Sequence, residues 1–193
     1  MKRFGKAPAL LALLIASTLT GADSLADPLH KYGNEGAWCH VDSGWMFPES
    51  VGGFARVLQP YSIDGNSDAA GAEYRQASGP LQGAVEVDVY GIDSMAADAN
   101  IDGAKATAAG KAGEGAKIES EKPFKLGAAK GLQGVKIKYA ADAGERTNLY
   151  YFTTDRWHVK VLAKGTGKES DKALDAFVQA LPWNTLGTNP GIH

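Results

Sequence analysis

Apolar side chains recur at every second position along much of the second half of the chain, and this alternation constrains the fold more than any other feature. Val85, Val87 and Val89 alternate with Glu86 and Asp88, which is typical of a β-strand with one buried face. Turn residues separate the last few strand-like runs, so we predict an antiparallel meander. The strand-like runs cover residues 54–63, 72–76, 84–90, 116–121, 133–140, 147–154 and 156–164.

Two helices are expected beside these strands. Ser94 can cap an alanine-rich helix that runs to about Gly113, and Ser170 can cap a second helix that ends before Pro182. We therefore predict an α+β fold in which an antiparallel sheet of about six or seven strands has two helices packed on it. The second helix has apolar residues at helical spacing: Leu174, Phe177, Val178 and Leu181.

The first 26 residues have the three parts of a secretory signal peptide. Lys2, Arg3 and Lys6 precede an apolar run at residues 9–16, and small residues allow a cut after Ala26. The apolar run is well short of the roughly 20 residues that span a bilayer. The sequence therefore predicts export to the periplasm or outside the cell, with no stable membrane insertion after signal cleavage.

The remaining chain is expected to form one domain. Much of the 44% apolar fraction is alanine, so the side chains suffice for one hydrophobic core rather than two. Residues 27–53 are predicted to be an irregular lead-in packed on the domain. Residues 54–186 are predicted to form the single α+β domain, and residues 187–193 a flexible tail.

Charge and motif content exclude several classes of function. The chain has 20 Lys and Arg against 22 Asp and Glu, so it has no electrostatic footprint for nucleic acid. Four histidines and one cysteine do not occur in a metal-ligand pattern. We predict no cofactor and no metal, and a small molecule or an envelope protein as the partner.

Five basic residues are predicted to share the polar face of the sheet: Lys136, Lys138, Arg156, His158 and Lys160. All five alternate with apolar neighbours on their strands. The favoured interpretation is cross-strand ion pairing on a solvated sheet face. The alternative is a surface that binds an anion or a carboxylate.

Cys39 is followed directly by His40, a pair that invites comparison with a nucleophile and its base. Adjacent side chains of an extended chain point to opposite faces, so the two would meet only on a kinked backbone. We expect Cys39 to be a small buried side chain between Trp38 and Val41. An intermolecular disulfide, which would indicate an envelope assembly subunit, stays open as an alternative.

Three segments resemble small exported bacterial proteins with the PsbP-like fold, an antiparallel sheet with flanking helices. They are residues 51–57, 150–160 and 177–183, read as VGGFARV, YYFTTDRWHVK and FVQALPW. The resemblance covers most of residues 50–183 and implies a binding or accessory role, without assigning ligand residues.

The sequence thus predicts an exported accessory or binding protein of the cell envelope with no evident catalytic mechanism. The alternative is a small hydrolase or thiol enzyme that uses Cys39 or the region of His158.

Overall fold

A computed structural model describes residues 27–32, 36–127, 132–141, 146–165 and 167–188. The predicted signal peptide and the last five residues of the predicted tail lie outside these ranges. In chain order the elements are β1 (Leu29–Tyr32), β2 (Ala37–His40), β3 (Met46–Phe47), β4 (Ser50–Val51), β5 (Phe54–Arg56), β6 (Tyr61–Ser62), β7 (Ala69–Gln76), β8 (Val85–Gly91), α1 (Ile101–Ala112), β9 (Lys117–Phe124), β10 (Gln133–Ala140), β11 (Arg146–Thr153), β12 (Trp157–Gly165), α2 (Gly167–Ala180) and the 3₁₀ turn η1 (Trp183–Thr185).

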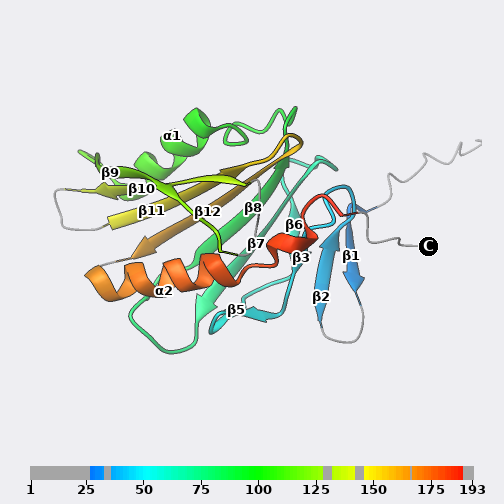
Figure 1. The fold of residues 1–193 in the computed structure, drawn as a ribbon, viewed down its shortest axis with the longest axis horizontal. Helices are drawn as coiled ribbons and strands as arrows, with labels where there is room; N and C mark the ends of the chain where they lie inside the picture. Colours follow the sequence, from blue (N-terminus) through cyan, green and yellow to red (C-terminus); the bar gives the residue numbers. More distant parts are fainter. Residues whose placement is uncertain (1–26, 33–35, 128–131, 142–145, 166, 189–193) are drawn as a thin grey trace, which may run out of the picture.

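Within the described ranges, nine strands form one antiparallel sheet and three short strands form another (Figure 1). The large sheet has the order β4-β5-β7-β8-β12-β11-β10-β9, and β6 pairs with β7. Strands β9 to β12 form the predicted meander, in which each strand pairs with the next one in the chain. Strand β12 also pairs with β8. The small sheet, β1-β2-β3, lies beside the end of the large one near η1 (Figure 1).

The predicted fold class is therefore wrong. The chain is mostly β, with a nine-stranded sheet and a separate three-stranded sheet in place of one sheet of six or seven strands. Residues 27–53, expected to be irregular, contain β1 to β4. These strands have only two to four residues each, which is too short for alternation to reveal them.

The two helices cover opposite faces of the large sheet (Figure 1). The apolar side of α2 packs on one face through Leu174, Phe177, Val178 and Leu181, in the larger core cluster. The small side chains of α1 pack on the other face through Ala104, Ala108 and Ala112. Strand β11 explains why both faces need cover, because six of its residues in a row are buried, from Thr147 to Phe152.

Helix α1 begins six residues later than predicted. The side chain of Asn100, not that of Ser94, caps it by accepting from the backbone N–H of Gly103 at 2.9 Å. Residues 92–100 form turns and bends instead of helix. At Gly103 a Cβ would lie 1.9 Å from the carbonyl oxygen of Ala97, so this glycine lets the turn segment pack against the helix.

Candidate functional site

The five basic residues predicted to share one sheet face do not do so. Strand register places Lys136 and Lys138 on the face covered by α2, opposite Tyr150 and Asn148 of β11. There Lys136 Nζ lies 2.5 Å from Asp175 Oδ1. Lys138 forms an ion pair with Asp171, and both aspartates belong to α2. These two ion pairs join α2 to the sheet.

His158 and Lys160 lie on the opposite face, which is covered by α1. His158 pairs in register with Thr153, and Lys160 with Tyr151. Arg156 is exposed in the turn between β11 and β12. The prediction of one polar face failed because it placed both helices on the same side of the sheet.

Lys160 is buried in a polar cluster, which we call the Lys160 cluster: Lys160, Asp88, Asp98 and Tyr90. The lysine is only 2% exposed. Its Nζ lies 2.9 Å from Asp88 Oδ2 and 3.2 Å from the Tyr90 hydroxyl, and it forms an ion pair with Asp98. A buried charge of this kind is tolerated only because it is paired and hydrogen-bonded.

The pKa values of the two carboxyl groups in the Lys160 cluster are shifted in opposite directions. Desolvation raises the pKa of the fully buried Asp88, and it outweighs the attraction of Lys160. Desolvation also acts on Asp98, but there the hydrogen bond and charge of Lys160 win and lower the pKa. For Lys160, the charge of Asp88 and the hydrogen bond to Asp98 outweigh desolvation and raise the pKa. The charged pair is therefore Lys160 with Asp98, and Asp88 is the group most easily protonated.

The Lys160 cluster holds the segment that leads into α1. Asp98 belongs to that segment, and it also accepts a hydrogen bond from the Tyr90 hydroxyl at 2.9 Å. The next residue, Ala99, accepts from the Tyr151 hydroxyl at 2.7 Å through its carbonyl oxygen. Strands β8, β11 and β12 thus position the first turn of α1 over the sheet.

A cavity of about 460 Å³ lies where α1 begins, and we call it the His158 cavity. Two cross-strand rows form its floor, Gln133–Thr153–His158 and Val135–Tyr151, from β10, β11 and β12. A volume of this size is in the usual range for small-molecule sites. The complete lining is Asn100, Ile101, Gln133, Gly134, Val135, Tyr151, Thr153 and His158.

His158 is the titratable group of interest in this lining. Its ring stacks on that of Tyr151, with 5.4 Å between centroids and 30° between planes. Desolvation lowers its pKa, so the ring is neutral at pH 7. Its Nδ1 atom is buried and has no hydrogen-bond partner among the described residues. An unsatisfied buried nitrogen of this kind is uncommon in folded proteins.

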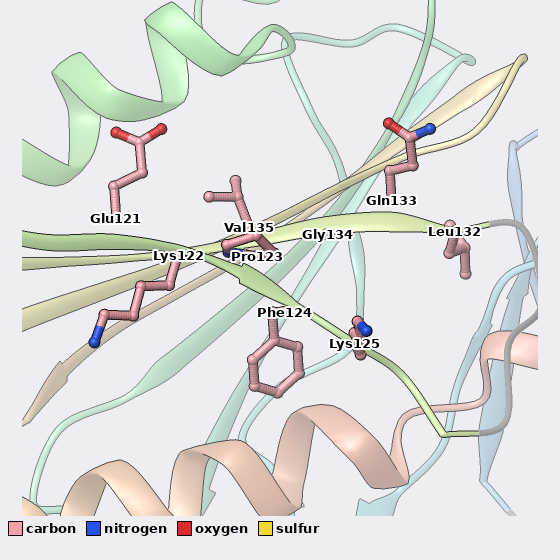
Figure 2. Close-up of a pocket in the computed structure, with 9 residues that line it drawn as sticks. All are labelled: Glu121, Lys122, Pro123, Phe124, Lys125, Leu132, Gln133, Gly134 and Val135. Carbon is pink, nitrogen blue, oxygen red and sulfur yellow. The ribbon is translucent and has the colours of Figure 1, made fainter.

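A second cavity, of about 530 Å³, surrounds the paired ends of β9 and β10 (Figure 2). It shares Gln133, Gly134 and Val135 with the His158 cavity. Its lining also includes the charged residues Glu121, Lys122 and Lys125. Figure 2 shows Phe124 and Lys122 on the side of α2 and Val135 on the side of α1, so this cavity wraps a sheet edge.

Cys39 is confirmed as a buried side chain, with no exposed surface. Desolvation raises the pKa of its thiol, so this environment does not produce a thiolate. His40 is also buried, and its ring is engaged elsewhere: Nε2 donates to the Ser67 carbonyl oxygen at 2.7 Å, and Nδ1 lies 2.8 Å from Ser43 Oγ. His40 therefore joins the small sheet to the loop before β7.

Sequence reasoning missed most of the cavity. It singled out His158 and Lys160, but not Tyr151, Thr153 or the residues that begin α1. One signal was available: the run Leu149–Phe152 is apolar at every position, which indicates a strand covered on both faces. The position of Asp98 beside Lys160 had no such signal, because the two are brought together only by the turns of residues 92–100.

The chain matches no protein-family model and no curated protein. Among the described residues, no three His, Cys, Asp or Glu side chains are arranged to hold a metal ion. No helix in the described part of the chain is long and apolar enough to cross a membrane.

Proposed function

We propose that the protein is an exported accessory or binding module of the cell envelope, and that it binds a small organic molecule in the His158 cavity. The observation that carries this proposal is the cavity itself, about 460 Å³ between the start of α1 and the sheet. The signal-peptide pattern of residues 1–26 supports the location.

The construction of the walls supports binding. Ligand sites are usually preformed hollows with mostly apolar walls and a few polar groups. Here the floor belongs to three adjacent strands, and the wall at Asn100 and Ile101 is held by the contacts of Asp98 and Ala99. These contacts hold the walls in place before any ligand arrives, and such preorganisation reduces the entropy lost on binding.

The enzymatic alternative gains no comparable support. A general base needs a group that orients its ring, and His158 Nδ1 has no partner among the described residues. The thiol of Cys39 is buried and its pKa is raised. These environments favour binding over catalysis.

Native mass spectrometry on the mature protein, recovered gently from its host envelope, tests the proposal. We expect a reproducible extra mass that is lost on denaturation. The variant Thr153→Trp fills the cavity and should come without the extra mass, and Thr153 does not line the second cavity. Val57→Trp is the matched control, because Val57 is 40% exposed and does not line the cavity.

Two results would contradict the proposal. A bare protein in the wild type, at native conditions and across preparations, would exclude a tightly held ligand. An extra mass that persists in folded Thr153→Trp would place the ligand elsewhere.

A further inference from the structure

We propose that Lys160 and Asp98 join in an isopeptide bond, an amide between the two side chains that forms with loss of one water molecule. The inference does not depend on the His158 cavity or on any ligand. It follows from the composition of the Lys160 cluster, where an amine contacts two carboxyl groups and a tyrosine hydroxyl. The bond ties the segment that leads into α1 to strand β12.

The amine and the carboxyl group that reacts with it are held together by the fold. Lys160 belongs to β12, its side chain is 2% exposed, and it forms an ion pair with Asp98. Groups held in contact react as if each were present at an effective concentration of about 10⁵–10⁸ M. Both groups belong to one chain, so no molecule has to enter the cluster and burial does not hinder the reaction.

The second carboxyl group, that of Asp88, is placed to carry protons. Asp88 lies directly across from Lys160 in the pairing of β8 with β12, and its Oδ2 is 2.9 Å from Lys160 Nζ. Desolvation raises the pKa of Asp88, which favours its neutral form. A neutral carboxyl group donates one proton and accepts another, which is the task of a general acid and base.

The hydroxyl of Tyr90 is placed to stabilise the intermediate. It donates a hydrogen bond to Asp98 Oδ1 at 2.9 Å, and burial raises its pKa, so the hydroxyl keeps its proton. A donor aimed at a carboxyl oxygen stabilises the negative charge that develops there when an amine adds to the carbon. Oδ1 therefore becomes the carbonyl oxygen of the amide, and Oδ2 is the atom that leaves.

The reaction balances without an oxidant, a reductant or a cofactor. One proton passes from the Lys160 ammonium group to Asp98 Oδ2, and the neutral Nζ then adds to Asp98 Cγ. Asp88 accepts a second proton from Nζ and donates its own to the Oδ2 hydroxyl group. The Cγ–Oδ2 bond breaks, water leaves, the Nζ–Cγ amide keeps one N–H, and Asp88 ends in its starting form.

Burial slows the first step and favours the product. The pKa of Lys160 is raised and that of Asp98 is lowered, so the pair is charged at rest and few molecules hold the neutral amine at any moment. Freshly folded protein therefore contains the ion pair, and the bond accumulates with time. The amide is neutral and removes the desolvation penalty of two charges. The side chain of Asp98 is 20% exposed, which gives the released water a way out.

Peptide mapping by mass spectrometry tests the proposal on the purified mature protein, soon after purification and again after weeks of incubation. An amide at Lys160 prevents cleavage by trypsin, so the peptide of residues 157–164 should appear joined to that of residues 76–105. The joined mass should be lower than the sum of the two peptides by one water molecule. Lys136 and Asp175 are the internal control: they are also paired, but Asp175 is 42% exposed, and they should stay unlinked.

Two variants test the assigned roles, with circular dichroism to confirm that each is folded. Asp88→Asn keeps the size of the side chain and leaves the Lys160–Asp98 pair in place, and it should slow bond formation by about a hundredfold or more. Asp98→Ala removes the carboxyl group that reacts, so trypsin should cut after Lys160 at every time point.

Wild-type protein in which Lys160 stays fully open to trypsin after weeks of incubation would overturn the inference, and this result needs no variant. A joined peptide in which fragmentation places the bond on Asp88 would overturn the choice of Asp98. Bond formation at the wild-type rate in Asp88→Asn would overturn the role of Asp88 as proton carrier.

Discussion

Replacement of Lys160 by methionine is the sharpest test of how the Lys160 cluster supports the fold and the cavity. Methionine fills a similar volume and removes only the charge and its hydrogen bonds. The variant leaves Asp98 without its cation and leaves the segment before α1 held by fewer contacts. We therefore expect lower stability and a disturbed His158 cavity.

The magnitude follows from the burial of the pair. Removal of one partner from a buried ion pair typically destabilises a protein by about 3–5 kcal/mol. Asp98 keeps a fifth of its side chain exposed and can regain some water, so the lower end applies. A loss of about 3 kcal/mol corresponds to a melting temperature lower by about 6–12 °C for a chain of this size.

The assay is thermal and urea unfolding followed by circular dichroism. Lys105→Met is the matched control, because Lys105 pairs with Glu121 at 2.9 Å on the surface, where both side chains are partly exposed. Its loss should stay below about 1 kcal/mol. The double variant Lys160→Met with Asp98→Asn should regain part of the stability, since it no longer contains the unpaired carboxylate.

Two results would refute this reasoning. Equal losses of unfolding free energy for Lys160→Met and Lys105→Met would mean that burial does not increase the contribution of the Lys160–Asp98 pair. A double variant no more stable than Lys160→Met would mean that the unpaired charge of Asp98 is not the cause.

Three further predictions concern other parts of the fold. Burial lowers the pKa of His40 below its unfolded value of 6.5, so the stability of the fold should fall as the pH drops below 6.5. Urea midpoints measured at pH 7.5 and pH 5.0 show this fall, and His40→Gln should make it smaller. Gly71→Ala places a Cβ 2.2 Å from Asp88 Oδ1, and it should cost about 1–3 kcal/mol of unfolding free energy, whereas Gly110→Ala, with open space around it, should not destabilise. Phe177→Ala removes a fully buried ring 4.6 Å from that of Phe54 and should cost about 3–5 kcal/mol, a value that a denaturant titration checks directly.

The local elements were largely predictable. The alternation at residues 84–90, 133–140 and 156–164 corresponds to β8, β10 and β12. The helical spacing from Leu174 to Leu181 matches the buried side of α2. These signals are local, because each depends only on the side-chain period of one element.

The candidate site was predictable only in part. His158 and Lys160 were assigned correctly to one face of their strand, but Lys136 and Lys138 were wrongly added to that face. The register between strands decides which side chains share a face of the sheet, and a shift of one residue moves every side chain of a strand to the other face. The sequence of a single strand contains no information about that register.

The amino-acid sequence by itself determined the strands of the meander, the amphipathic character of α2 and the burial of Cys39, because period and composition act over short distances. Only the tertiary structure decided that the helices lie on opposite faces, that Lys160 is buried beside Asp98, and that the start of α1 borders the His158 cavity. Each of these features depends on contacts between segments that are far apart in the chain, and such contacts form only when the whole sheet is assembled.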